Sequence, residues 1–109
     1  MSSKRLAVLE KMTGAGSTDP FAWYGLALEY KSVGRPDDAV ATFGKLRALD
    51  PGYVPQYLMC GALLTELGRA DEARGWLEAG VAAARAKGDA HALSELEGAL
   101  VALAGPGAG

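Results

Sequence analysis

Residue types that could do chemistry are few in this sequence, and they are scattered. There is one histidine, His91, and one cysteine, Cys60, whereas a metal site needs three or four ligands in a cluster. No Cys/His pair or Ser/His/Asp set offers an activated nucleophile. The glycine-rich segment GAGST at residues 14–18 lacks the lysine and the spacing of a phosphate-binding loop. We therefore expect no cofactor, no metal and no enzyme activity, and an enzyme is only a remote alternative.

The composition is that of an ordinary globular domain and excludes several other classes. Of the 109 residues, 50% are hydrophobic and 22% are charged. The net charge is −2 and the basic residues are interspersed with acids, which argues against nucleic-acid binding. The longest apolar stretch, residues 57–64, is far shorter than the roughly 20 residues of a membrane span. One cysteine allows no internal disulfide and fits a reducing compartment. The sequence thus predicts a cytoplasmic protein without membrane insertion.

Helix start and stop signals are regularly spaced along the chain. Ser3, Asp19 and Asp89 are expected to cap helices, and Pro20 and Pro36 stand in first turns. Gly34, Gly68 and Gly88 are expected to follow helix ends. Leu6, Leu9 and Met12 share one face of the first helix. No segment alternates apolar and polar residues as a half-buried strand does, so we predict an all-α protein. The expected helices cover residues 3–13, 20–33, 36–49, 54–67, 70–87 and 89–104.

One turn sequence occurs twice, 34 residues apart. GRPDDA begins at Gly34 and GRADEA begins at Gly68. The acids start the next helix, and the alanines Ala39 and Ala73 let two helices approach closely. Aligning residues 20–53 with 54–87 gives identities at 34/68, 35/69, 37/71, 39/73 and 48/82. A helix–turn–helix unit of this length is typical of solenoid repeats.

These residues resemble the tetratricopeptide repeat. The first copy matches the family pattern with Trp23, Leu26, Ala27, Tyr30, Gly34, Ala39, Phe43 and Pro51. The second copy matches with Tyr57, Gly61, Gly68, Ala73 and Leu77, and departs from the pattern at Cys60, Leu64, Gly80 and Arg85. Cys60 stands at a core leucine position, so we expect a buried, unreactive thiol there.

The resemblance implies a right-handed α-solenoid of about six helices, similar to small stand-alone bacterial proteins of this family. It implies a single domain over residues 1–104, followed by a disordered tail at 105–109. Within that domain we expect an N-terminal half-repeat helix and loop (1–16), two repeats (20–53 and 54–87) and a capping helix (88–104).

In this family the first helix of each repeat faces an inner groove. The best-known ligand mode of that groove, a clamp for a C-terminal carboxylate, is not expected, because Tyr24, Leu28 and Met59 stand at its Lys and Asn places. We instead expect an apolar groove that binds a peptide or protein segment. Phe21, Tyr24 and Leu58 are the expected anchors, because they have no evident packing role. The candidate groove residues are Phe21, Tyr24, Leu28, Lys31, Leu58, Met59, Ala62 and Thr65.

The alternative function is self-association through the last helix or the groove. Leu93, Leu96, Leu100 and Leu103 should pack on the preceding helix. Ala92, Ala99, Val101 and Ala102 leave little polar surface elsewhere, so a second copy is expected to cover the outer side of this helix. Six glycines inside predicted helices (25, 44, 61, 75, 80 and 98) each cost stability. Only Gly61 falls where the family requires a small residue.

Overall fold

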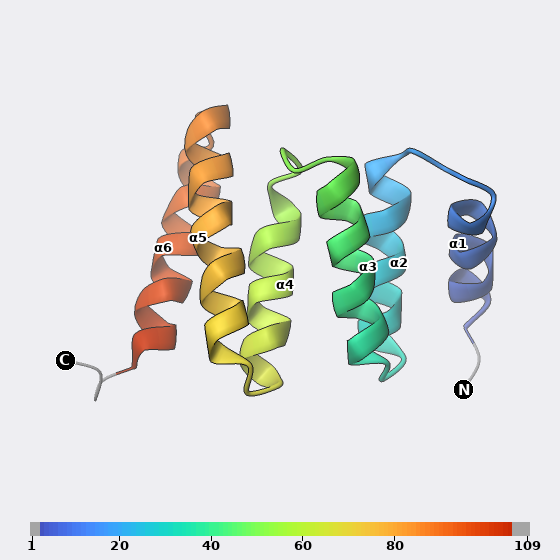
Figure 1. The fold of residues 1–109 in the computed structure, drawn as a ribbon, viewed down its shortest axis with the longest axis horizontal. Helices are drawn as coiled ribbons and strands as arrows, with labels where there is room; N and C mark the ends of the chain where they lie inside the picture. Colours follow the sequence, from blue (N-terminus) through green and yellow to red (C-terminus); the bar gives the residue numbers. More distant parts are fainter. Residues whose placement is uncertain (1–2, 106–109) are drawn as a thin grey trace. The chain divides into compact units, whose positions relative to one another are not determined.

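The described part of the chain, residues 3–105 of a computed structural model, is entirely α-helical (Figure 1). Every helix begins and ends within two residues of its expected bounds, so the all-α fold class is confirmed. Gly105 follows the last helix, and the rest of the predicted disordered tail lies outside the described residues. The helices are α1 (Lys4–Gly14), α2 (Pro20–Ser32), α3 (Pro36–Leu49), α4 (Pro55–Glu66), α5 (Ala70–Lys87) and α6 (Ala90–Ala104).

Three helices begin at the side-chain caps that the sequence predicts. The hydroxyl of Ser3 accepts a hydrogen bond from the backbone N–H of Leu6 at 3.0 Å. Asp19 accepts one from Phe21 N–H at 3.0 Å, directly before Pro20. Asp89 caps α6 in the same way. Each cap satisfies a backbone donor that the first turn of a helix leaves without a partner.

The two repeated turns have the same backbone conformation. Gly34 and Gly68 have φ values of +79° and +75°, in the left-handed region that glycine adopts without steric cost. The N–H of the following arginine then donates back into the preceding helix, from Arg35 to Tyr30 O at 2.8 Å and from Arg69 to Leu64 O at 2.9 Å. The left-handed glycine caps are therefore confirmed in both repeats.

The acidic residues after these turns also form ion pairs with the arginines of the turns. Neither α3 nor α5 has a side-chain N-cap hydrogen bond. Instead, Arg35 Nε donates to Asp38 at 2.8 Å, and Arg69 Nη2 donates to Glu72 Oε1 at 2.8 Å. The hydrogen bond from Arg69 lowers the pKa of Glu72. All four acids lie in the first turns of α3 and α5, as expected, where negative charge is favourable at the positive end of the helix dipole, and two of them also pair with the arginine of the turn.

The chain forms two compact units that meet between Pro51 and Gly52. The first unit contains α1, α2 and α3, and the second contains α4, α5 and α6. In the first unit Leu6, Leu9 and Leu26 form a buried cluster. In the second, the buried cluster is Val54, Tyr57, Leu77, Ala84 and Leu96. The repeat boundaries within one domain remain a prediction.

The buried face of α1 differs from the expected one. Leu6 and Leu9 are buried, but Met12 is 44% exposed and Thr13 is buried in its place. The Thr13 hydroxyl donates to the carbonyl oxygen of Leu9 at 2.9 Å, which satisfies it inside the unit. Because successive helical residues are about 100° apart, residues 6, 9 and 13 form a narrower stripe than 6, 9 and 12. The placement of Met12 on the packing face is therefore wrong.

The last helix packs on α4 and α5 through its leucines, as expected. Leu96 is 1% exposed, and Leu93, Leu100 and Leu103 pack around the same cluster. Ala92 and Ala99 also pack against it, so they do not belong to the outer side of α6. Of the four residues expected on that side, only Val101 and Ala102 are exposed.

Candidate functional site

The two residues with the most reactive side chains lie apart from any reactive cluster. Cys60 is fully buried in α4. His91 is exposed on α6, with its Nε2 3.1 Å from Glu95 Oε1 one helical turn away. Within residues 3–105 no three His, Cys, Asp or Glu side chains gather as a metal site would require. The candidate residues to be placed next are therefore those on the surfaces of α2 and α4.

The candidate residues of α2 lie on one side of that helix. Phe21 is 67% exposed, directly after the Asp19–Pro20 start of the helix. Tyr24, Leu28 and Lys31 follow it at helical spacing and are half-buried. The residues between them are the buried ones: Ala22, Gly25, Leu26 and Ala27.

The candidate residues of α4 have a similar arrangement within the second unit. Leu58 and Met59 are half-buried, whereas Ala62 and Thr65 are exposed. The Thr65 hydroxyl donates to the carbonyl oxygen of Gly61 at 2.8 Å, so it is occupied within the helix. The buried residues of α4 are Gln56, Tyr57, Cys60, Gly61, Leu63 and Leu64.

Two of the three expected anchors have packing partners. The Tyr24 ring meets the ring of buried Phe43 edge to face, with centroids 6.3 Å apart. Leu58 packs against the buried cluster of the second unit. The expectation that these two residues lack a packing role is therefore wrong. Among the three, Phe21 is the one exposed beyond half of its surface.

An apolar groove between α1 and α2 escaped the sequence analysis. Val8 and Met12 of α1 are 58% and 44% exposed, beside Phe21 of α2. They line a cavity of about 390 Å³, together with Lys4, Arg5, Leu9, Asp19, Ala22 and Gly25. The sequence of α1 could have indicated this groove, because the helix has more apolar residues than one narrow face can bury. We call this surface the α1–α2 groove.

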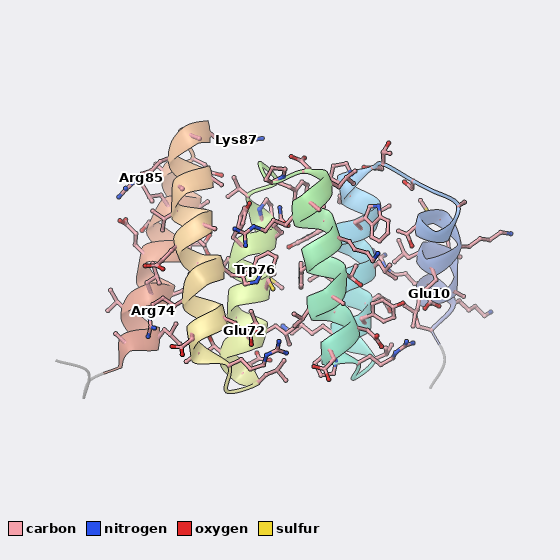
Figure 2. The ribbon with its side chains drawn as sticks, viewed as in Figure 1. Glu10, Glu72, Arg74, Trp76, Arg85 and Lys87 are labelled. Carbon is pink, nitrogen blue, oxygen red and sulfur yellow. The ribbon has the colours of Figure 1, made fainter. Side chains whose placement is uncertain are left out.

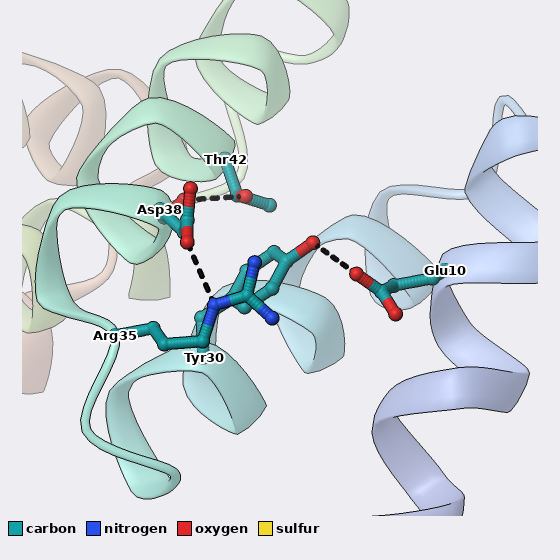
Figure 3. A network of polar contacts seen from close by, with 5 residues as sticks. All are labelled: Glu10, Tyr30, Arg35, Asp38 and Thr42. Atoms are coloured by element: carbon teal, nitrogen blue, oxygen red, sulfur yellow. Dashed lines mark hydrogen bonds and ion pairs between the residues drawn. The ribbon is translucent and has the colours of Figure 1, made fainter.

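A polar network joins the three helices of the first unit (Figure 3). The Tyr30 hydroxyl donates to Glu10 Oε2 at 2.7 Å, and the Arg35 guanidinium lies 4.6 Å from the centre of the Tyr30 ring. The hydrogen bond to Glu10, then burial and the charge of Glu10, raise the pKa of Tyr30. Thr42 donates to the carbonyl oxygen of Asp38 at 2.7 Å. The network thereby connects α1, α2 and the start of α3 within the first unit.

Of the basic residues labelled on α5 in Figure 2, Arg74 and Arg85 lie beside acidic residues. Arg74 Nη1 lies 3.2 Å from Asp71 Oδ1, and Arg85 Nη2 lies 3.6 Å from Glu97 Oε2 of α6. These pairs are solvent-exposed and give α5 no excess positive surface. None of the described helices combines the length and apolar character needed to cross a membrane.

Comparison with known proteins matches this helical arrangement to one family. A tetratricopeptide repeat family model matches residues 32–96. A tetratricopeptide repeat domain protein from Salinibacter ruber, solved in solution, is 36% identical with a TM-score of 0.76, over 81% of this chain and 89% of that one. The crystal structure of a tetratricopeptide repeat domain protein from the same organism is 37% identical with a TM-score of 0.75. The match covers 80% of this chain and 98% of that one.

More distant likenesses extend over most of the chain. The protein BPP2914 from Bordetella parapertussis is 28% identical with a TM-score of 0.78, covering 95% of this chain and 90% of that one. The secretion chaperone SycD from Yersinia enterocolitica shares the fold alone, at 16% identity and a TM-score of 0.81. The match covers 90% of this chain and 68% of that one. A comparison with curated proteins gave no match. From the family model, the Salinibacter structures and the two left-handed glycine turns, we conclude that this chain belongs to the tetratricopeptide repeat family.

Proposed function

We propose that this chain is a non-enzymatic protein-interaction module that binds a peptide or protein segment through the candidate faces of α2 and α4. One observation supports this proposal above the others. None of the eight candidate residues is buried, whereas the residues between them on both helices largely are. Each helix therefore keeps part of this side exposed, at Phe21 on α2 and at Ala62 and Thr65 on α4.

The chemistry of these rows favours an apolar or mixed ligand. Phe21, Leu28, Leu58 and Met59 offer aliphatic and aromatic surface, and methionine adapts to ligands of different shape. Lys31 is the one charged member of the set. A few apolar anchors give modest affinity that depends little on salt, since screening acts on exposed charges.

The experiment that tests this proposal starts with capture of binding partners from a native lysate and continues with two matched variants. Ala62 and Ala41 are both exposed alanines inside helices, but only Ala62 belongs to a candidate face. Ala62→Glu should weaken the captured complex by about tenfold or more, because a desolvated charge opposes an apolar contact. Ala41→Glu should leave the affinity unchanged. Phe21→Ala should weaken the complex as Ala62→Glu does.

The affinity is measured by isothermal titration calorimetry at low and high salt. Suppose that binding falls steeply with salt, yet resists Ala62→Glu and Phe21→Ala. The candidate faces would then be the wrong surface, and the charged outer residues of the helices would be the place to look.

A further inference from the structure

We infer that the α1–α2 groove is an interface at which two copies of this chain pair about a two-fold axis. This inference goes beyond the proposed function, and the two share only Phe21. It rests on the geometry of the groove, on three exposed apolar side chains and on the arrangement of charge along it.

The groove runs the length of two antiparallel helices. Near one end, Arg5 Nε of α1 lies 3.4 Å from Glu29 Oε2 in the last turns of α2. Farther along, Leu9 faces Gly25, and beyond it lie Asp19 and Phe21 at the start of α2. The missing side chain of Gly25 keeps the floor of the groove low. A pair of helices with an open apolar face can pack on an equal pair to form a four-helix arrangement.

Three of the four exposed large hydrophobic residues of the first unit lie at this groove, and the fourth, Leu49, does not line it. Val8, Met12 and Phe21 are three of the six large hydrophobic side chains most exposed among the described residues. They line one cavity of about 390 Å³, so they form a continuous surface. Scattered apolar residues on a protein surface need no explanation, but a contiguous group marks an interaction site.

Charge along the groove is self-complementary. Lys4 and Arg5 line the end near Glu29, and Asp19 lines the end near Phe21. An isologous interface brings the same surface of two copies together in opposite directions. Turning one copy by the two-fold axis therefore places Lys4 beside Asp19 of the second copy, whereas Arg5 remains paired with Glu29 of its own copy. Val8 and Met12 lie between the two charged ends, close to the axis.

The last helix offers a weaker surface for self-association. Ala92 and Ala99 pack against the core of their own unit. Val101 remains exposed at 74%, but it shares the exposed side of α6 with His91 and Glu95. A lone valine on a mixed polar surface does not form an apolar patch.

Two variants with the same chemical change test the inference by sedimentation velocity. Wild-type protein should shift from monomer to dimer between about 1 μM and about 1 mM, the range of weak and transient pairs. Val8→Glu should weaken dimerisation by more than about tenfold, because it buries an unpaired charge in each copy. Val101→Glu is the matched control and should leave the dimer constant unchanged. Both residues are exposed, and circular dichroism checks that both variants fold.

Site-directed cross-linking tests the two-fold axis itself. Val8→Cys or Met12→Cys should be joined to its own copy by a short bismaleimide, whereas Val101→Cys should not. Cys60 is fully buried and does not compete for the reagent. A wild type that stays monomeric throughout overturns the inference. A dimer that persists in Val8→Glu, or that is lost only in Val101→Glu, also overturns it. The same holds if neither Val8→Cys nor Met12→Cys is cross-linked between two copies. Failure here leaves partner binding at Ala62 unaffected, so the two proposals fail separately.

Discussion

Adding one methyl group at Gly80 should destabilise the second unit. A Cβ built at Gly80 lies 2.5 Å from the Cβ of Tyr57 and 2.8 Å from Cδ2 of Leu96. The Leu96 methyl is the far end of a flexible side chain and can shift more easily than backbone atoms. The Tyr57 Cβ is bonded directly to the backbone of α4, so it cannot turn away. Gly80→Ala therefore has to push α4 and α5 apart.

The size of the effect follows from two opposing contributions. Overpacking of a buried contact costs about 1–3 kcal/mol. Replacing a helical glycine by alanine returns about 0.5–1 kcal/mol. We expect Gly80→Ala to lower the free energy of unfolding by up to roughly 2.5 kcal/mol. Gly75→Ala on the same helix is the matched control, because nothing lies within 4 Å of its Cβ. It should raise the free energy of unfolding by about 0.5–1 kcal/mol.

Urea unfolding followed by circular dichroism measures both variants against wild type. The helix-propensity contribution is common to the two, so the difference between them isolates overpacking, at about 1–3 kcal/mol. Hydrogen exchange should localise the loss of protection in Gly80→Ala to the amides of α4, α5 and α6. If both variants stabilise the protein equally, the close approach of α4 and α5 at Gly80 is refuted.

Two further predictions concern other contacts. Ala73 is fully buried and Glu78 is exposed. Ala73→Leu should therefore lower the melting temperature by several degrees, whereas Glu78→Gln should barely change it. Equal shifts in melting temperature would contradict the helix register. The Glu10 hydrogen bond raises the pKa of Tyr30, so its stabilising effect is present below the ordinary tyrosine pKa and lost as pH rises through the raised one. Glu10→Gln should lower the Tyr30 pKa towards its ordinary value in an NMR titration of the ring carbons, and an unchanged pKa would count against the network.

The helix boundaries and turns were predictable because local chemistry sets them. Ser3, Asp19 and Asp89 cap helices with their own side chains, and Gly34 and Gly68 adopt a backbone conformation that most residues avoid. These signals act between residues only a few positions apart, so they can be recognised in the sequence without the structure. The resemblance to the repeat family then predicted which helices pack against each other.

The side chains around the candidate site were harder to predict, because their exposure depends on residues far away in the sequence. Tyr24 is half-buried because Phe43 of the next helix contacts its ring. Gly80 is required because α4 and α6 both approach α5 at that point. Met12 lies outside the packing stripe because α1 buries the narrower stripe of Leu6, Leu9 and Thr13. Periodicity gives the face of a helix only to within about one residue, and contacts such as these decide the rest.

The single buried cysteine makes this protein suited to native-state thiol labelling. Cys60 is fully inaccessible in α4, and no other thiol exists in the chain. An alkylating reagent can therefore react only when the helices around Cys60 open. At reagent concentrations where reclosing is faster than alkylation, the labelling rate gives the free energy of that opening. The first unit has no thiol, so the same measurement would report whether disturbances in α1 or α2 reach the second unit.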